Sequence, residues 1–193
     1  MRPTDETEDK TLIERAKMGD QKAYESLVRR YQHSIYRLCL GMTGTHPSAD
    51  DLAQETFIKA YFALARFKEG TNFYAWIRRI ALNSSLNYIK RRRREEPLGD
   101  RAGDNPGAVF SSKIETPHDE LLRNDTGRTV NKALKALPPK LRAVFMLHAV
   151  EGLKYEDIAQ TLGLPAGTVM SRLSRARHRL RKSLAGCLGR SEA

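Results

Sequence analysis

The sequence predicts an all-α protein made of two small helical domains joined by a flexible linker. Apolar residues recur at spacings of three and four along most of the chain, the period of an amphipathic helix, and no segment shows the alternation typical of a strand. Between residues 95 and 118 this periodicity stops, and prolines alternate with glycines. Hydrophobic residues make up 40% of the chain and charged residues 30%, so packed cores are expected rather than wholesale disorder.

The predicted N-terminal domain, residues 10–94, contains a long amphipathic helix. The apolar stripe of this helix comprises Tyr24, Leu27, Val28, Tyr31, Ile35, Leu38, Cys39 and Met42. Gly41, Gly44 and Pro47 are expected to break the pattern. Ser48 and Asp51 then have the spacing of a capping box, although Asp replaces the preferred Glu or Gln, so we expect the next helix to start there.

This next helix is predicted to have one apolar and one polar face. Its apolar residues are Ala53, Phe57, Ala60, Tyr61 and Leu64. Its polar residues are Asp51, Gln54, Glu55 and Lys59. An acidic and polar face does not suit contact with DNA, so it is a candidate site for a protein partner, although a solvated face would have the same pattern.

The third helix of this domain follows a polar loop, Lys68–Asn72, and ends in the cationic run Lys90–Arg94. Aromatic side chains beside Asn72, Asn83, Asn87 and several cations are typical of a surface that binds unstacked bases. The helical spacing of Phe73 and Trp76 with Ile77 and Ile80 indicates that these two rings belong to the core. The loop, Asn83 and the outward arginines are therefore the better candidates for base contact. The cationic run, which adjoins the linker, fits contact with phosphates, although a solvated helix end or a nuclear-import patch would have the same pattern.

The linker, residues 95–118, could span about 80 Å when fully extended. Two turns of B-DNA cover roughly 70 Å. The linker is therefore long enough to let the two domains occupy DNA sites two helical turns apart.

The predicted C-terminal domain, residues 119–187, contains four helical patterns. Their apolar positions are Val130, Ala133, Leu134 and Leu137, then Leu141, Val144, Phe145 and His148, then Tyr155, Ile158, Ala159 and Leu162, and finally Val169, Leu173, Ala176, Leu180 and Leu184. Pro138 stops the first pattern, Pro139 is suited to the first turn of the second, and Gly152 ends the second.

Residues 155–177, YEDIAQTLGLPAGTVMSRLSRAR, have the layout of a helix-turn-helix. The small residues Ala166, Gly167 and Thr168 would let the second helix approach DNA, where its N-terminal N–H groups can meet a phosphate. Val169 and Leu173 are expected to face the core. The residues expected to project outward are Ser171, Arg172, Ser174 and Arg175. Seven cations and no acid lie between Asp157 and Glu192, which favours a phosphate backbone over an ordinary solvated helix.

Charge and composition narrow the function classes. The net charge of +11 and the pI near 9.9 indicate a polyanionic partner. No apolar stretch is long enough to span a bilayer, and the N-terminus lacks the apolar core of a signal peptide. Cys39 and Cys187 are far apart in helical patterns, so both are expected to act as small buried hydrophobes in a cytoplasmic, reduced protein.

Two blocks of the sequence resemble regions of one protein family, and together they cover most of residues 20–185. The first block resembles region two of the sigma factors of bacterial RNA polymerase; it reads DDLAQETFIKAY (50–61) and FYAWIRRIALNSSLNYIKRRRR (73–94). The second resembles their region four; it reads LPPKLRAVFMLHAVEGLKYEDIAQTLGLPAGTVMSRLSRAR (137–177). In its short length and in having no other recognisable sigma region, the chain resembles the extracytoplasmic-function group.

The resemblance implies a factor that binds core RNA polymerase, recognises the minus-35 and minus-10 promoter elements and assists melting of the DNA. The residues implied in binding the polymerase β′ clamp helices are Asp51, Gln54, Glu55 and Lys59. Those implied at the minus-10 element are Lys68, Gly70, Thr71, Asn72, Phe73, Trp76, Arg79, Asn83, Asn87 and Arg91. Those implied at the minus-35 element are Tyr155, Ala166, Gly167, Thr168, Ser171, Arg172, Ser174, Arg175 and Arg177.

The resemblance also implies partners beyond promoter DNA. Region four would contact the polymerase β flap, the linker would thread toward the RNA exit path, and an anti-sigma factor would restrain the protein. We expect no catalytic residue, cofactor or metal and no stable homo-oligomer. Asn87 stands where relatives often have an acid and Ser174 where some have an aromatic, so the promoter sequence is left open.

Two other function classes compete with this interpretation. A helix-turn-helix regulator with an N-terminal sensing or dimerising domain would bind a palindromic operator alone, as a two-fold dimer. An enzyme acting on nucleic acid, such as a resolvase or nuclease, would need a cluster of catalytic or metal-binding groups. The five histidines are scattered, and Asp50, Asp51 and Glu55 are better explained as a helix start and a partner face.

Overall fold

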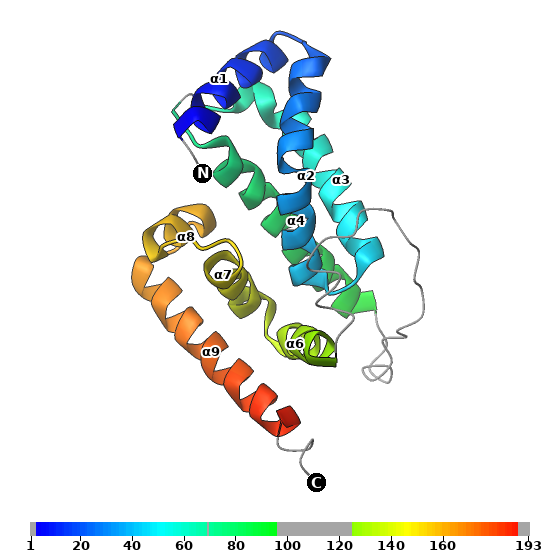
Figure 1. Cartoon of the computed structure of the whole chain (residues 1–193), viewed down its shortest axis with the longest axis vertical. Helices are drawn as coiled ribbons and strands as arrows, with labels where there is room; N and C mark the ends of the chain where they lie inside the picture. The colour runs from blue at the N-terminus through cyan, green and yellow to red at the C-terminus, as the bar shows by residue number, and fades with distance from the viewer. Residues whose placement is uncertain (1–2, 69, 96–124, 189–193) are drawn as a thin grey trace.

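A computed structural model of the chain describes residues 3–68, 70–95 and 125–188. The helices of these segments, with one 3-10 turn (η1), are α1 (Pro3–Lys17), α2 (Gln21–Thr43), α3 (His46–Ala63), η1 (Leu64–Arg66), α4 (Phe73–Glu95), α6 (Asp125–Ala136), α7 (Pro139–Ala149), α8 (Tyr155–Leu162) and α9 (Ala166–Leu188). The predicted all-α fold class is confirmed (Figure 1). Apart from Glu95, the predicted linker 95–118 lies outside the described residues, as do residues 119–124 of the predicted C-terminal domain.

Helices α1–α4 form one bundle around the apolar stripe of α2. Leu27, Ile35, Leu38, Cys39 and Met42 are all essentially inaccessible to solvent, as the helical period predicted. The Asp20 carboxylate caps the start of α2 by accepting hydrogen bonds from the backbone N–H groups of Lys22 and Ala23, at 3.0 and 3.2 Å. At the other end Gly44 adopts a left-handed φ of +77° and closes the helix.

Of the three residues expected to break the helical pattern here, Gly44 ends α2, but Gly41 and Pro47 lie within helices. Gly41 does not interrupt α2, which runs through it to Thr43. The prediction that α3 starts at Ser48 is wrong, because the helix begins at His46 with Pro47 in its first turn, where the fixed φ of proline fits. The Ser48 hydroxyl is used in packing instead, 2.7 Å from the hydroxyl of Tyr88 on α4.

Helices α6–α9 form the second bundle. Ala133, Leu137, Leu141, Ala176 and Leu180 make one buried cluster between α6, α7 and α9. One predicted core residue differs: Val130 is 39% exposed.

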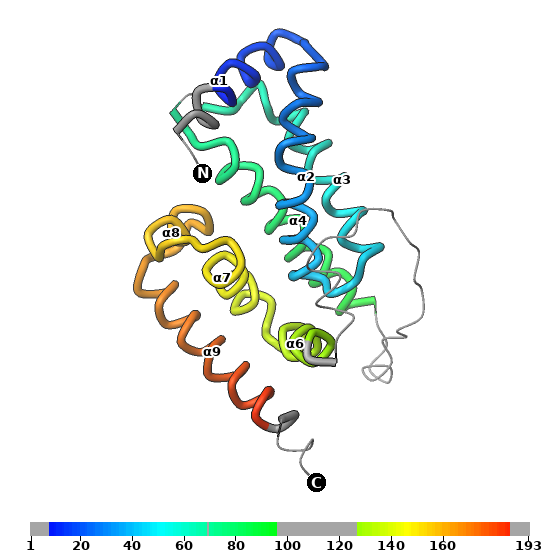
Figure 2. The backbone as a smooth tube through the Cα atoms, viewed as in Figure 1, coloured from blue at the N-terminus to red at the C-terminus, as the bar shows by residue number. Residues whose placement is uncertain are grey.

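The two bundles pack against each other (Figure 2). Helix α2 contacts α6 and α7, and α4 contacts α7 and α8. A single buried apolar cluster therefore extends from Leu27 and Ile77 in the first bundle to Met146, Ile158 and Leu173 in the second. In this conformation the predicted domains share a core.

Candidate nucleic-acid interface

The helix-turn-helix is formed by α8, a tight turn and α9. Gly163 ends α8 with a left-handed φ of +62°, and the backbone N–H of Leu164 then donates to the carbonyl of Ala159 at 2.9 Å. Val169 and Leu173 of α9 are buried, as predicted, and hold α9 against the rest of the bundle. The opposite side of α9 is left to face solvent.

The sequence-predicted minus-35 residues lie mostly on this outer side. The exposed members are Ala166, Gly167, Ser171, Ser174, Arg175 and Arg177, and the half-buried members are Tyr155, Thr168 and Arg172. The space in front of Gly167 is open, since no heavy atom beyond its own helical turn lies within 4 Å of where its Cβ would be. Arg175 folds over Ser171, with its Nε 3.2 Å from the Ser171 carbonyl oxygen and a terminal nitrogen 3.2 Å from Oγ. The surface of α9 is thus accessible and cationic.

A second polar row runs along α4. Arg79, Asn83, Asn87 and Arg91 follow one another at intervals of four residues, and all four are exposed. Residues separated by four lie on the same face of a helix. The structure therefore brings these predicted minus-10 residues into one line.

The loop before α4 presents Lys68, Gly70 and Thr71 to solvent. Asn72, half-buried, starts the helix: its Oδ1 accepts a hydrogen bond from the Ala75 backbone N–H at 2.9 Å. Asn72 thus has a structural role in addition to its predicted contact with DNA.

The aromatic residues of this region pack into the core. Phe73 is 2% exposed and contacts the rings of Tyr31, Phe67 and Trp76 at centroid distances of 5.5–5.7 Å. Trp76 is half-buried and lies edge-on to Phe67 at 5.0 Å. The core interpretation of Phe73 is confirmed, and a base contact by its ring would require the ring to leave this cluster.

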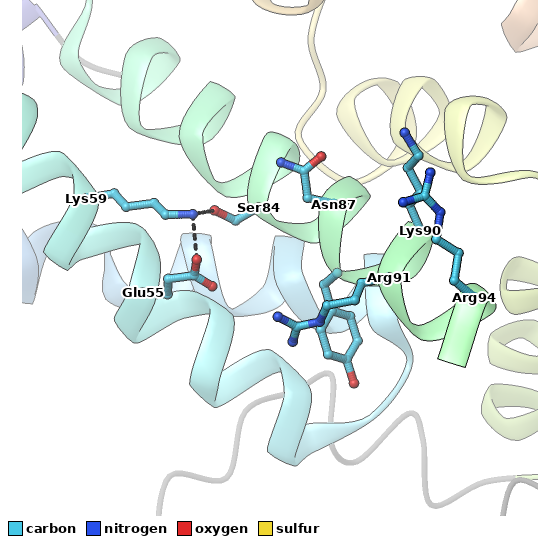
Figure 3. Close-up of a pocket in the computed structure, with 8 residues that line it drawn as sticks. Glu55, Lys59, Ser84, Asn87, Lys90, Arg91 and Arg94 are labelled. Atoms are coloured by element: carbon cyan, nitrogen blue, oxygen red, sulfur yellow. Dashed lines mark hydrogen bonds and ion pairs between the residues drawn. The ribbon is translucent and has the colours of Figure 1, made fainter. Parts of the chain in front are cut away.

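A groove of about 410 Å³ lies between α3 and α4 (Figure 3). The residues that line it are Glu55, Lys59, Ser84, Asn87, Tyr88, Lys90, Arg91 and Arg94. Lys59 lies between the two helices, with its Nζ 2.5 Å from a Glu55 carboxylate oxygen and 3.0 Å from Ser84 Oγ. The groove is cationic at its α4 side and meets the polar face of α3 at Lys59.

The outer face of α3 is only partly polar. Asp51, Gln54, Glu55 and Lys59 are exposed, as the pattern predicted. The same side of the chain also exposes three large apolar residues that sequence reasoning did not assign to a surface: Ile58 (52% exposed), Tyr61 (42%) and Phe62 (79%). Tyr61 was predicted to be core. Ile58 follows Glu55 by three residues and Phe62 follows Ile58 by four, and this helical spacing was the signal that could have identified them.

We also searched the described residues for features of a metal site, a reactive thiol or a membrane span. They contain no group of three or more His, Cys, Asp or Glu side chains that could hold a metal ion. Cys39 is fully buried, and burial raises the pKa of its thiol to about 12, so it is not a reactive nucleophile. No helix in the described segments has the length and apolar character needed to cross a bilayer.

An all-α chain with an exposed helix-turn-helix and a second polar and cationic helix face has the features of a DNA-binding protein with two contact modules. Family models match both modules: residues 27–95 match Sigma-70 region 2, and residues 128–180 match Sigma-70, region 4. The chain belongs to the sigma-70 family, in its extracytoplasmic-function group.

Similar proteins span nearly the whole chain. The RNA polymerase sigma-H factor of Pseudomonas aeruginosa is 39% identical over 92% of this chain and 94% of its own length. The ECF RNA polymerase sigma-E factor of Escherichia coli K12 is 38% identical over 88% of this chain and 90% of its own length.

Solved structures show the same architecture. The sigma factor RpoE in complex with the anti-sigma factor NepR, from Bartonella quintana, has a TM-score of 0.66 at 27% identity and covers 85% of this chain and 98% of that chain. CnrH in complex with the cytosolic domain of CnrY has a TM-score of 0.65 at 26% identity, over 93% and 98%. This chain is therefore a transcription initiation factor that acts with RNA polymerase and recognises promoters.

Proposed function

We propose that three faces of this chain divide the work of initiation: α9 reads the minus-35 element, α4 with the loop before it binds the opened minus-10 element, and α3 binds the polymerase. Polymerase supplies the catalysis, and this chain supplies the choice of start site. The observation that carries this proposal is that the exposed polar and cationic faces of α4 and α9 lie on different bundles, while α3 exposes the large apolar side chains Ile58 and Phe62.

The minus-35 role of α9 rests on its shape and charge. An α-helix fits the major groove of B-DNA, where arginine can pair with guanine through two hydrogen bonds. Arg175 is exposed and Gly167 leaves open space at the start of the helix. No acid lies between Asp157 and Glu192 to oppose the phosphates.

The minus-10 role of α4 rests on its row of amides and cations. Asn83 and Asn87 can accept and donate hydrogen bonds to the edges of extruded bases. Arg91 and Arg94, beside the same groove, supply positive charge for the backbone. Phe73 supports the loop from within the core, and half-buried Trp76 packs beside it.

The polymerase-binding role of α3 rests on its exposed apolar residues. Large apolar side chains rimmed by polar ones are typical of protein–protein contacts, where a few such side chains provide most of the affinity. Phe62 and Ile58 are the most exposed of them, and Glu55 and Gln54 form the polar rim. This face extends the predicted set Asp51, Gln54, Glu55 and Lys59.

We also infer a regulatory partner and a domain organisation for this chain. The two solved relatives were captured with NepR, an anti-sigma factor, and with CnrY, and we assign an anti-sigma partner to this chain as well. Residues 10–94 and 119–187 are the region-two and region-four domains and residues 95–118 the tether between them. The protein acts in the cytoplasm, as a monomer and without catalytic residues of its own.

Run-off transcription with core polymerase on a library of randomised promoters tests the proposal. Sequencing the starts used should give two preferred elements with a fixed spacing. Substitution Arg175→Ala should change preference in the upstream element only, and Asn83→Ala in the downstream element only. The assignment is refuted if the two substitutions alter the opposite elements or if the wild-type chain selects no promoters.

A further inference from the structure

Helix α1 packs beside the segment that connects α3 to α4. Its residues Ile13 and Ala16 are buried in the same apolar cluster as the stripe of α2. The helix also contacts η1, the turn that leads toward the loop before α4 (Figure 1). None of the three faces proposed above for DNA and polymerase lies on α1, so these faces give the helix no role.

Lys17, the last residue of α1, holds one end of the loop before α4. Its ammonium group donates a hydrogen bond to the backbone carbonyl of Phe67, with 2.7 Å between Nζ and the oxygen. The same Nζ lies 5.8 Å from the centroid of the Phe67 ring, within the range of a cation–π contact. The Phe67 carbonyl and the N–H of Lys68 belong to one planar peptide unit. Lys17 therefore fixes the orientation of the peptide from which the loop begins.

The loop that follows this peptide contains a tight turn. The Thr71 backbone N–H donates to the carbonyl of Lys68 at 3.3 Å, and Gly70 between them has a φ of +76°. Lys68 and Thr71 are both exposed. In a turn this short, rotation of the first peptide moves the side chains that the turn presents to solvent.

The ring of Phe67 also contacts the far end of the loop. Phe67 is 6% exposed, and its ring lies 5.7 Å from that of Phe73 and 5.0 Å from that of Trp76, between centroids. Both of these residues lie in the first turn of α4, directly after the loop. Lys17 thus contacts a residue that supports the loop at its start and at its end.

A second set of contacts fixes α1 in place. Asp9 is 3% exposed, and its carboxylate accepts hydrogen bonds from the Tyr31 hydroxyl and from the Arg30 guanidinium, the latter at 2.6 Å. The Tyr31 ring in turn stacks on Tyr74 in the first turn of α4, with 5.1 Å between centroids and 11° between the ring planes. Because α1 is attached to the start of α4 in this way, its last residue is a firm point of attachment for the loop.

We propose that Lys17 is a positioning residue for minus-10 recognition: through the Phe67 carbonyl it sets the orientation of Lys68 and Thr71 and so increases the discrimination between bases at the minus-10 element. Lys17 acts through the loop and not by touching the bases. This inference rests on the proposed function, because it takes the loop before α4 as a reader of that element.

Transcription from promoters with a randomised minus-10 element and a constant minus-35 element tests this role. Lys17 is exposed, so Lys17→Met should fold normally while it removes the charge and the hydrogen-bond donor. With core polymerase, it should reduce the discrimination between minus-10 bases by about three- to tenfold, the range that loss of one hydrogen bond gives. Lys17→Arg keeps a charged donor and should retain most of the discrimination.

The matched control removes another lysine from the same helix. Lys10 lies on the surface of α1, with its Nζ 3.9 Å from a carboxylate oxygen of Glu14 and its side chain 69% exposed. Lys10→Met should leave the minus-10 preferences unchanged. A general loss of stability, which urea denaturation of both variants would detect, lowers transcription from every promoter alike. A misplaced loop instead changes the ranking of the bases.

Trp76, the only tryptophan of the chain, gives a readout in the free protein. Its ring lies edge-on to that of Phe67, which Lys17 holds. Lys17→Met should therefore make the fluorescence of Trp76 easier to quench with acrylamide, and Lys10→Met should not. This measurement needs neither polymerase nor DNA.

Two results would overturn the inference. One is a set of minus-10 preferences that is as strong in Lys17→Met as in Lys10→Met. The other is equal weakening on every minus-10 sequence with a smaller dependence on salt, which would assign Lys17 to a DNA phosphate instead.

A variant of the loop itself separates this outcome from failure of the proposed function. The double substitution Lys68→Ala and Thr71→Ala removes two exposed side chains and should alter the minus-10 preferences if the loop reads that element. If it does so and Lys17→Met does not, the inference fails and the proposed function stands. If the double substitution changes no minus-10 preference, the proposed role of the loop fails, and the role of Lys17 fails with it.

Discussion

At the scale of single residues, Arg175 is the most direct test of DNA reading by α9. Its guanidinium is exposed and lies against Ser171 within the predicted minus-35 face. If it pairs with a guanine, Arg175→Ala should weaken holoenzyme binding by about 1–3 kcal/mol and remove the preference at one base pair. Arg175→Lys should not restore it, because an ammonium cannot make the paired contact.

Fluorescence anisotropy with promoter fragments altered one base pair at a time measures this effect. The control is Arg29→Ala, which removes an exposed arginine of α2 and should change no base preference. Equal weakening on every sequence, with a smaller dependence on salt, would assign Arg175 to a phosphate and contradict base reading.

Cys39 gives a residue-scale prediction about protection. Because its thiol is buried with a pKa of about 12, little thiolate is present at neutral or mildly alkaline pH. In a Cys187→Ser variant, a disulfide reagent should react with Cys39 only as fast as the protein unfolds. Rapid reaction of the folded protein at pH 8 would show that the packing around α2 is looser than described.

At the scale of elements, the start of α4 depends on one side chain. Asn72 accepts the backbone hydrogen bond of Ala75, so Asn72→Ala should lower the free energy of unfolding by about 1 kcal/mol. Asn72→Asp should keep the stability, since its carboxylate accepts the same bond beside the positive end of the helix. Urea denaturation followed by circular dichroism measures both.

An exposed residue within α4 serves as the control for this cap. Asn87→Ala should change stability by less than about 0.5 kcal/mol, because Asn87 faces solvent in the middle of the helix. If Asn72→Ala is equally harmless, the hydrogen bond from Ala75 to Asn72 contributes nothing to stability.

Phe62, on the outer face of α3, can be compared with Met18, an equally exposed apolar residue outside that face. Phe62 is 79% exposed on α3, and Met18 is 80% exposed at the end of α1. If α3 binds the polymerase, Phe62→Ala should weaken the affinity for core enzyme by about 1–2 kcal/mol and Met18→Ala should not. Titration of labelled protein with core polymerase measures both, and equal effects of the two substitutions would contradict this surface.

Helix positions were predictable from the sequence, but some boundaries and surfaces were not. The stripe of α2 and the inward side of α9 follow from a spacing that the core enforces directly. The start of α3 was missed because proline at the first turn competes with a capping pattern, and Ser48 is recruited by Tyr88. Exposure of Phe62 and Ile58 was not predicted, because the acidic and polar residues of the same face indicated a purely polar surface.

At the scale of the whole molecule, the packing of one bundle on the other could not be predicted. Periodicity reports that a side chain is buried, but it does not report which partner buries it. Gly41 therefore suggested a helix break, whereas in the structure it lies inside α2, and a Cβ there would be 2.0 Å from Cε of Met146, which is 105 positions later. The buried ion pair of Glu151 with Arg78, with 3.7 Å between a carboxylate oxygen and a guanidinium nitrogen, was not predicted either, because an acid after a helix end is usually solvated. The resemblance of the two sequence blocks indicated the family, but it did not indicate how the two bundles are placed relative to each other.

We expect this chain to find promoters only together with polymerase, and footprinting on a selected promoter measures this. With core polymerase added, the chain should protect two elements about two helical turns apart, with opening of the DNA at the downstream one. The chain alone, at the same concentration, should protect neither. Strong protection of a palindromic site by the chain alone, unchanged when core polymerase is added, would contradict the account.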